Sequence, residues 1–286
     1  MKFSVIIPTY KREEDLLRCL DSIKLQSLAP DEVIVIDDDS ITEVLEVTYY
    51  KKDHSKHNRG TAVSRNLGLS LIRNNIFFIL DDDLVLDPGF FKNIISLWES
   101  SNEKTVGIGG VISNNRGKSI FEKVYSSVFG LTSKYKWDVT SSVFQVWNDK
   151  IGRVEEGYYA HGGACSYDAS RVRSLGGFYV FREGLSELED IEFCLRAKTG
   201  GFHFLIEPLS KTLHLHSPGG REGEYSRGFR EGYNRNIIFQ KHGTSSRLAF
   251  LWASFGWSFK QLLRGNFRRF FGLIKGNYSN GKDSSK

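Results

Sequence analysis

The sequence has few cysteines and no long apolar run. Its 286 residues include Cys19, Cys165 and Cys194, which lie far apart and form no CxxC pair. An odd number of widely spaced cysteines argues against a disulfide framework and favours reduced thiols in a cytoplasmic protein. The longest uncharged apolar stretch, residues 248–259, is shorter than the roughly 20 residues that span a bilayer.

The sequence also lacks an internal repeat and a Gly/Ser linker, and we expect no secretion signal in its first residues. The segment MKFSVIIPTY carries one charge, and its apolar run before Pro8 is too short for the core of a signal peptide. We expect this segment to form a first strand instead. Without repeats or linkers, the simplest expectation is a single mixed α/β domain with a C-terminal appendage.

The first half of the chain alternates between strand and helix patterns. We expect strands at 3–7, 32–36, 45–51 and 76–80, a helix beginning at Glu13, and a helix from 61 to about 73 that Thr61 caps. This order predicts a parallel sheet with right-handed crossovers, whose ligands bind at the carboxyl ends of the strands. Residues 113–160 lack a clear periodicity, and we expect them to form an insertion over that crevice.

Acidic residues follow two of these strands. Asp37-Asp38-Asp39 ends the second strand, and Asp81-Asp82-Asp83 follows the strand at 76–80. Three crowded carboxylates repel one another unless a cation neutralises them, and a hard divalent ion such as Mg²⁺ or Mn²⁺ suits oxygen ligands and phosphate. The spacing of Asp81 and Asp83 would let one reach a nucleotide ribose and the other the metal. A solvated acidic turn is the alternative.

The earlier acidic segment has three interpretations. Asp37 to Ser40 could accept hydrogen bonds from a nucleobase or a ribose, or could form a turn whose side chains bond their own backbone. Asp37-x-Asp39 also resembles the aspartyl-nucleophile box of haloacid-dehalogenase phosphatases. Ile41 stands where that box has Thr or Val, which argues against this class.

Four segments in order resemble the motifs of family 2 glycosyltransferases with the GT-A fold. They are VIIPTYKR, VIVIDDDS, NRGTAVSRNLGL and FFILDDDLVLDPGF, within a matching region of about 3–245. The resemblance implies a Rossmann-like mixed sheet flanked by helices and an inverting, metal-dependent sugar transfer. It also implies donor-nucleotide contacts from Pro8, Thr9, Tyr10, Asp38, Asp39, Arg65, Asp81 and Asp82, with Asp81 and Asp83 on the metal.

The resemblance extends to the catalytic base and the acceptor pocket. LSELEDIEFCLR matches the family's Glu-Asp pair, which makes Asp190 the expected base and Glu189 the second choice. Ser186 and Glu189 also have capping-box spacing, which would leave Asp190 facing the crevice. His161, Gly162 and Gly163 match a stretch that lines the acceptor and sugar pocket, where glycine lets backbone approach a ligand. A plain turn is the alternative there.

Histidines and arginines further along are candidate metal and phosphate ligands. His214 and His216 point the same way along a strand-like segment, and the resemblance implies that one completes the metal shell. We favour His214 and leave His216 open; an exposed strand face without a ligand is the alternative. Arg65 carries the family match for a phosphate partner. Arg221, Arg227, Arg230 and Arg235 lie in a Gly-rich stretch, 217–236, that could be a loop over the donor or a solvated charged loop.

The C-terminal segment is basic and aromatic. From Arg247 to Lys275 there are six Lys/Arg and no Asp or Glu, with eight Phe and Trp among them. This composition favours an interfacial helix on anionic headgroups, and a helical hairpin packed on the catalytic domain is the alternative. Aromatics beside arginine can also stack on nucleic-acid bases, but the segment has no nucleic-acid motif and we expect no nucleic-acid partner.

These patterns together predict a two-part chain. Residues 1–245 would form the transferase domain, with 1–112 binding the nucleotide-sugar and 113–245 the acceptor, and residues 246–286 would form a helical amphipathic tail. We expect the donor to be a UDP-sugar and the acceptor to be a glycan or a lipid-linked molecule. We also expect a peripheral location at the inner face of the cell membrane. The alternative function is an inactive protein that binds nucleotide-sugar; the presence of Asp190 argues against it.

Overall fold

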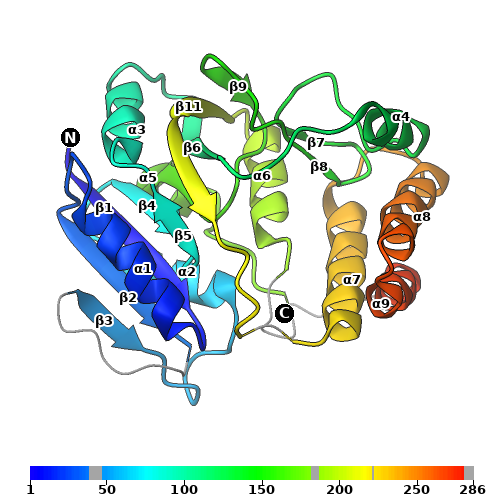
Figure 1. Cartoon of the computed structure of the whole chain (residues 1–286), viewed down its shortest axis with the longest axis horizontal. Coiled ribbons are helices and arrows are strands. Elements are labelled where there is room, and N and C mark those ends of the chain that lie inside the picture. The colour runs from blue at the N-terminus through cyan, green and yellow to red at the C-terminus, as the bar shows by residue number, and fades with distance from the viewer. Residues whose placement is uncertain (39–46, 182–186, 221, 280–286) are drawn as a thin grey trace.

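A central mixed sheet organises the chain (Figure 1). The computed structural model describes residues 1–38, 47–181, 187–220 and 222–279. The strand order is β3-β2-β1-β4-β10-β6-β11-β5, with β9 paired to β11. The first-half elements are β1 (Phe3–Thr9), α1 (Glu13–Lys24), β2 (Glu32–Asp37), β3 (Thr48–Lys51), α2 (Thr61–Leu71), β4 (Ile76–Leu80), β5 (Leu84–Leu86), α3 (Phe90–Glu99) and β6 (Thr105–Ile112).

Parallel pairing brings the acidic strand ends to one edge of the sheet. Strand β1 pairs in parallel with both β2 and β4, and Thr9 lies opposite Asp37. The expected strands and the expected start of the first helix are confirmed, and the described part of the 45–51 strand is β3. The predicted cap of α2 is wrong, because Thr61 is the first helical residue and Gly60 is the N-cap, with a φ of 121° that favours glycine.

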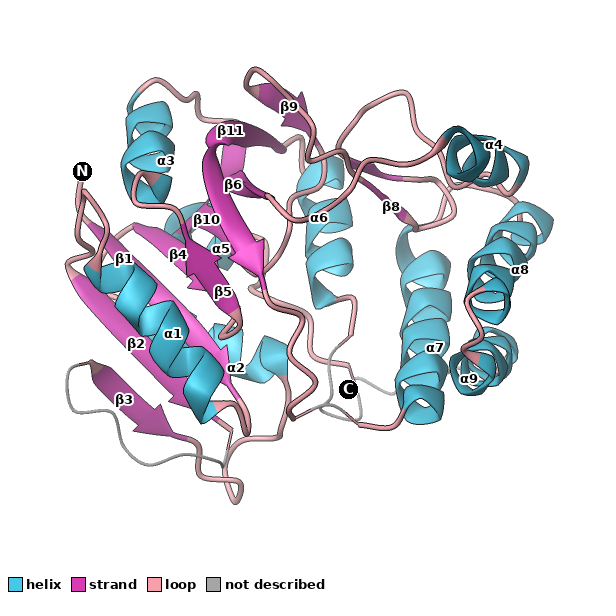
Figure 2. Cartoon of the chain, viewed as in Figure 1, coloured by secondary structure: helices cyan, strands magenta, loops and turns pink. Residues whose placement is uncertain are grey.

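The sheet is covered on both faces, as the cyan helices and magenta strands of Figure 2 show. Side chains alternate between the two faces of β1. Val5 and Ile7 pack in one core with residues of α1 and α3, and Ile6 packs in the other core with residues of α2 and α6. The remaining elements are α4 (Ile120–Val128), β7 (Asp138–Val139), β8 (Gln145–Val146), β9 (Glu155–Gly157), β10 (Ala164–Asp168), α5 (Ala169–Ser174), α6 (Glu189–Thr199), β11 (His203–His214), α7 (Glu224–His242), α8 (Arg247–Leu263) and α9 (Phe267–Tyr278).

Two of these elements correct the sequence analysis. Residues 113–160 contain α4, whose Ser119 cap forms a capping box with Glu122. The Gly-rich stretch at 217–236 is helical from Glu224 onward, so its interpretation as a loop is wrong there. Its glycines serve close helix packing instead. A Cβ at Gly228 or Gly232 of α7 would collide with the backbone of α9, and one at Gly272 or Gly276 of α9 with the backbone of α7.

The C-terminal helices pack on the rest of the chain. Phe250 of α8 is buried and stacks on Phe239 of α7, while Tyr125 of α4 donates a hydrogen bond to the Gly256 carbonyl of α8 at 2.7 Å. Helices α4, α8 and α9 therefore gather beside α7, at the right of Figure 1. No helix in the described ranges is long and apolar enough to cross a membrane. The three cysteines are buried and unpaired.

Candidate active site

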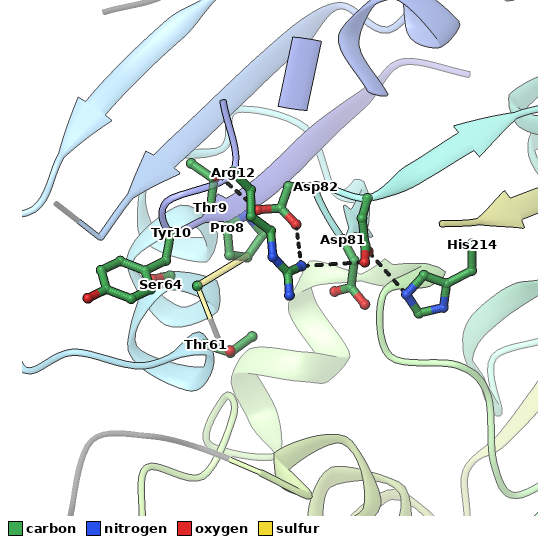
Figure 3. Close-up of a pocket in the computed structure, with 11 residues that line it drawn as sticks. Pro8, Thr9, Tyr10, Arg12, Thr61, Ser64, Asp81, Asp82 and His214 are labelled. Atoms are coloured by element: carbon green, nitrogen blue, oxygen red, sulfur yellow. Dashed lines mark hydrogen bonds and ion pairs between the residues drawn. The ribbon is translucent and has the colours of Figure 1, made fainter. Parts of the chain in front are cut away.

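A cavity of about 300 Å³ lies at the carboxyl edge of β1 and β4 (Figure 3). Its walls come from the end of β1, the start of α2, the acidic segment after β4, and the end of β11. The lining residues are Pro8, Thr9, Tyr10, Arg12, Thr61, Ser64, Asp81, Asp82, Asp83, His214 and Gly220. The strand-end rule therefore placed the cavity correctly, and Arg12, Thr61, Ser64 and Gly220 also line it although the sequence had not assigned them to the site.

Asp82 is held from two sides. Thr9 donates to one carboxylate oxygen at 2.9 Å, and the Arg12 guanidinium donates to the other at 2.9 Å. Burial raises the pKa of Asp82 to about 6, against the lowering effect of Arg12. Asp82, which the resemblance assigned to the nucleotide, lines the cavity and is held in position by these two hydrogen bonds.

Asp81, Asp83 and His214 form a cluster with the composition of a metal site. Their ligand atoms lie within 4.8 Å of one another, and His214 Nε2 is 3.1 Å from Asp83 Oδ1. Burial acts to raise the pKa of Asp83, but the hydrogen bond and charge of His214 and the charge of Arg12 lower it overall. Two carboxylates and one imidazole nitrogen are a ligand set that fits a divalent metal ion.

The two histidines are placed differently. His214 ends β11 beside Asp83, and the His216 ring packs on the His214 ring with centroids 4.0 Å apart. His216 adopts a φ of 54°, in the left-handed region. His214 is the histidine whose ring nitrogen joins the carboxylate cluster among the described residues.

Arg12 ties the acidic edge to the segment after β11. Its guanidinium is 3.4 Å from Asp83 and donates to the carbonyls of Gly219 at 2.6 Å and Ser217 at 3.3 Å. Figure 3 shows the side chain reaching across the cavity toward Asp82. A cation at this position offsets the charge of the crowded carboxylates and offers a donor fork to a phosphate. Its place at the end of VIIPTYKR was the one sequence signal for it.

The end of β2 is linked to the start of α2. Asp38 accepts from the Gly60 backbone N–H at 2.8 Å and lies 3.0 Å from the Lys52 ammonium. Asp37 accepts a hydrogen bond from Tyr49 at 2.6 Å. Asp39, which was also assigned to the nucleotide, lies outside the described residues.

Arg65 of α2 is a buried cation between two parts of the site. Its guanidinium is 2.9 Å from the Glu189 carboxylate and 3.7 Å from Asp81. Burial acts to lower the pKa of Arg65, but the charges of Glu189 and Asp81 keep it raised overall. Arg65 therefore links the acidic edge to the start of α6, which the phosphate-partner assignment did not anticipate.

The start of α6 presents two carboxylates with different surroundings. Glu189 is buried against Arg65, whereas Asp190 is partly buried and accepts from its own neighbour, the Ile191 N–H, at 2.9 Å. Burial raises the pKa of both carboxyls, against the opposing charge of Arg65. The proposed capping box is wrong in position, because Leu188 is the N-cap and α6 begins at Glu189; Ser186 lies outside the described residues.

Gly162 and Gly163 lie between Asp190 at the start of α6 and Asp81 after β4. A Cβ at Gly162 would come within 2.6 Å of Asp190 Cβ, and a Cβ at Gly163 would collide with the Asp81 carboxylate. The Asp81 N–H also donates to the Gly163 carbonyl at 2.9 Å. The glycine pair is thus a close-packed junction between the acidic edge and α6, because neither position has room for a side chain.

His161, next to this junction, has a partner that the sequence did not reveal. Its Nε2 is 3.1 Å from Asp149 Oδ1, and its ring packs edge-on against Trp137, Trp147 and Tyr159. Burial acts to raise the pKa of Asp149, but the hydrogen bond and charge of His161 lower it overall. Asp149 follows no strand and belongs to no motif, so it carried no signal.

The other candidate arginines lie on α7 rather than on a loop. Arg235 is buried, 3.1 Å from Glu231, with its guanidinium 4.2 Å from the Phe144 ring. Arg227 pairs with Glu224 at 2.8 Å, and Arg230 pairs with Glu222. Two of these pairs lie within α7, and the third joins α7 to the segment just before it. Arg221 lies outside the described residues.

The sequence that forms the acidic edge, together with the segment that follows it, matches the profile of a known protein family. The profile of glycosyl transferase family 2 matches residues 4–154, which is more than half of the chain. The chain belongs to glycosyl transferase family 2. This match covers β1 to β8 and includes the Asp81–Asp83 segment, so the family resemblance drawn from the four motifs is confirmed.

Relatives of this family 2 glycosyltransferase include the glycosyltransferase GlyA of Streptococcus pneumoniae. It is 28% identical over 193 residues, which are 55% of this chain and 27% of GlyA. The chain thus spans only about a quarter of the length of that relative.

Solved structures share the fold. The mannosyltransferase PcManGT of Pyrobaculum calidifontis, in complex with GDP-Man and Mn²⁺, matches with a TM-score of 0.57 at 14% identity, over 98% of this chain and 76% of that one. Staphylococcus aureus TarS, residues 1–349 with UDP-GlcNAc, matches with a TM-score of 0.57 at 17% identity, over 93% and 74%. The expected GT-A fold is therefore confirmed.

Proposed function

We propose that the protein transfers a sugar from a nucleotide-diphosphate donor to an acceptor hydroxyl in polysaccharide-type synthesis, with inversion at the anomeric carbon. The observation that carries the proposal is the Gly162–Gly163 junction, where Asp81 of the acidic edge meets Asp190 of α6. A donor-side carboxylate and a candidate base thus lie against two adjacent glycines. Inverting transfer needs both groups within reach of one anomeric carbon.

The donor side would bind the nucleoside diphosphate along the ends of β1, β2 and β4. We assign Asp81, Asp83 and His214 to a divalent metal ion, on the strength of their mutual spacing. When bound, Mn²⁺ or Mg²⁺ would neutralise negative charge on the leaving diphosphate. Arg12 lies at the same edge and would add a cationic donor fork for the phosphates.

Asp190 would act as the general base. The acceptor oxygen forms a bond to the anomeric carbon while the bond from that carbon to the diphosphate oxygen breaks. The acceptor proton goes to the Asp190 carboxylate, and the electron pair leaves with the nucleoside diphosphate. Burial raises the pKa of Asp190, which brings its basicity closer to that needed at neutral pH. Glu189 is less suited to the role because it is paired with Arg65.

The acceptor would enter beside His161, from the 113–245 half of the chain. Aromatic rings and the Asp149–His161 pair give this side both a stacking surface and hydrogen-bonding groups. We further propose that the acceptor is a glycan or a lipid-linked sugar and that the chain works peripherally at a membrane surface. The basic, aromatic composition of residues 247–275 supports the membrane location.

The proposal is tested first by thermal unfolding of the full chain with UDP, GDP, TDP and CMP, each with Mn²⁺ or with EDTA. A ligand at a hundredfold excess over its Kd stabilises the native state by about 2.7 kcal/mol. We expect one nucleotide to raise the Tm with Mn²⁺ and to lose that effect in EDTA. Release of the same nucleoside diphosphate from its sugar conjugate then measures turnover.

Two results would separate the alternatives. Metal-dependent nucleotide binding without turnover on any acceptor would favour an inactive nucleotide-sugar-binding protein. A folded sample that no nucleotide stabilises, with or without Mn²⁺, would reject the proposed donor site.

A further inference from the structure

Helices α4 and α8 expose apolar side chains on one shared surface. On α4 these residues follow at intervals of one to four, and on α8 at intervals of three, four and eight, so each set lies along one helix side. We call this surface the α4–α8 face; its members are Ile120, Phe121, Val124 and Val128 of α4, and Leu248, Trp252, Phe255 and Leu263 of α8. Ile120 is 81% exposed and Leu248 79% exposed, values unusual for large apolar residues in such number.

The two helices are fixed against each other, so the face is a continuous surface. The Trp252 indole N–H donates to the Val128 carbonyl at 2.8 Å, and the Phe129 ring stacks on Trp252 with centroids 4.8 Å apart. At the other end Lys260 lies 3.5 Å from Glu122. The apolar stripes therefore run side by side, and Figure 1 shows both helices at the edge of the molecule beside α7.

The core does not account for these side chains, because each helix already buries another side. Phe250 and Ala253 of α8 are buried on the opposite side of the helix from Leu248 and Phe255. A helix with apolar residues on two sides needs a second apolar environment beyond its own domain. Helix α9, which packs on α8, also carries the exposed Phe267 and Phe271.

Charge decides which partner fits. Residues 247–275 contain six basic residues and no acidic one, and α4 adds Lys123. Of the six, Arg269 is paired with Glu224 and Glu231 of α7. The one acid of α4, Glu122, is already near Lys260 and Arg264, at 3.5 and 3.8 Å. Two copies of this face would bring like charges together, which disfavours self-association. Anionic lipid headgroups supply the opposite charge, the acyl region accepts the apolar stripes, and an interfacial Trp suits the boundary between them.

We propose that the α4–α8 face seats the protein flat on an anionic bilayer, with α4 and α8 both in contact with lipid. The inference deepens the membrane location in the proposed function and rests on it. It assigns half of the contact to α4, which lies outside the basic C-terminal segment. Helix α7 lies between this face and α6, so seating on lipid leaves the carboxyl edge of the sheet accessible.

The test measures sedimentation of the full chain with phosphatidylcholine vesicles that contain or lack phosphatidylglycerol. An α4 variant carries Ile120→Gln, Phe121→Gln and Val124→Gln; an α8 variant carries Leu248→Gln and Leu263→Gln. We expect each to partition about tenfold or more weakly into the anionic vesicles. The matched control carries Leu25→Gln and Leu209→Gln, which are 74% and 66% exposed elsewhere on the surface, and should bind like the wild type.

Trp252 gives an independent reading of depth. It is 49% exposed, whereas Trp98 and Trp137 are buried. Brominated lipids should quench the wild-type fluorescence, and Trp252→Phe should remove most of the quenching without changing vesicle binding by more than a few fold.

Several outcomes would overturn the proposal. Wild-type binding by the α4 variant with loss in the α8 variant would leave the C-terminal segment as the sole anchor. Absence of vesicle binding, combined with lipid-free dimers that the variants abolish, would assign the face to a second copy. Equal binding to both vesicle types would reject the role of charge. Nucleotide-induced stabilisation is measured on every variant, so failure of the donor site is detected separately from failure of the face.

Discussion

The acidic edge of the sheet and the α4–α8 face depart from ordinary burial in opposite ways. The edge buries charge: Asp82 and Asp83 are almost inaccessible, and Arg65 is buried beside Glu189. The face exposes apolar groups, from Phe121 to Leu263. Each arrangement costs free energy in the isolated chain, because desolvated charge and hydrated apolar surface are both unfavourable.

Each region would recover that cost with a different kind of partner. At the edge, positions are fixed by short hydrogen bonds and by glycines that leave no room for a side chain, as expected where a small ligand must meet precise geometry. On the face, Trp252 is held by its hydrogen bond to the Val128 carbonyl, and the exposed apolar side chains extend from their helices, as suits a fluid partner that adapts to them. Substitutions at the acidic edge should therefore lower the rate of catalysis. Substitutions on the α4–α8 face should weaken the partitioning of the protein onto lipid vesicles.

The largest effect should come from the candidate base. Asp190→Asn removes the proton acceptor but keeps the size of the side chain and its hydrogen bond to the Ile191 N–H. We expect turnover to fall by about 10²- to 10⁴-fold, with nucleotide binding unchanged. Product release measures turnover, and metal-dependent thermal stabilisation measures binding. Turnover close to the wild-type value would remove Asp190 from the mechanism.

The glycine junction should be nearly as sensitive. In Gly163→Ala the added methyl would collide with the Asp81 carboxylate and displace it from the cluster with Asp83 and His214. A displacement of about 1 Å can cost about 10²-fold in rate, and we expect a loss of that order.

Gly152→Ala is the matched control for this change. A Cβ at Gly152 has no atom within 4 Å among the described residues, so the variant should keep wild-type turnover. Equal turnover in the two variants would show that the close contact at Gly163 is not needed for catalysis.

The acidic edge could be predicted from the sequence because the order of the parallel strands places their acidic carboxyl ends side by side. Apolar runs that end in Asp37 and in Asp81 placed both carboxylates at one edge before any contact was known. Arg12 and Asp149 were missed because each acts through a partner that is distant in the sequence. Arg12 binds Asp82, 70 residues away, and Asp149 contacts His161, 12 residues away. Neither partner stands in a local motif with it.

The helical region was less readable because its signals are ambiguous. Glycines at 228 and 232 are typical of a loop, yet in α7 they allow α9 to approach. Ile120, Val124 and Val128 have helical spacing, but the segment around them is short and its apolar residues face outward. Local pattern does not distinguish a glycine that bends the chain from one that admits a neighbouring backbone.

The metal cluster gives the next prediction. His214→Ala removes the imidazole beside Asp83, and we expect Mn²⁺ affinity in the presence of nucleotide to fall by about tenfold or more. Electron paramagnetic resonance of free Mn²⁺ measures the affinity. His216→Ala is the matched control and should change it by less than about threefold. The reverse order of effects would transfer the ligand role to His216.

The smallest effect concerns buried charge away from the edge. Burial and the charge of Glu231 raise the pKa of Glu187 to about 7, against the lowering effects of Arg227 and Arg230. An acid with a raised folded-state pKa contributes stability that is full below its unfolded pKa of 4.5 and is lost as pH rises to about 7. Glu187→Gln should remove this loss, on the order of 1 to 2 kcal/mol after allowance for partial exposure.

Glu224 provides the control of opposite sign. Burial acts to raise the pKa of Glu224, but hydrogen bonds and charges from Asn266, Arg227 and Arg269 lower it overall, so its contribution is lost as pH falls. Urea unfolding between pH 3 and 7.5 should show Glu187→Gln gaining on the wild type as pH rises from 4.5 to 7.5, and the stability deficit of Glu224→Gln shrinking as pH falls below 4.5. If both variants showed the wild-type pH dependence of the free energy of unfolding, neither Glu187 nor Glu224 would contribute to the pH dependence of stability.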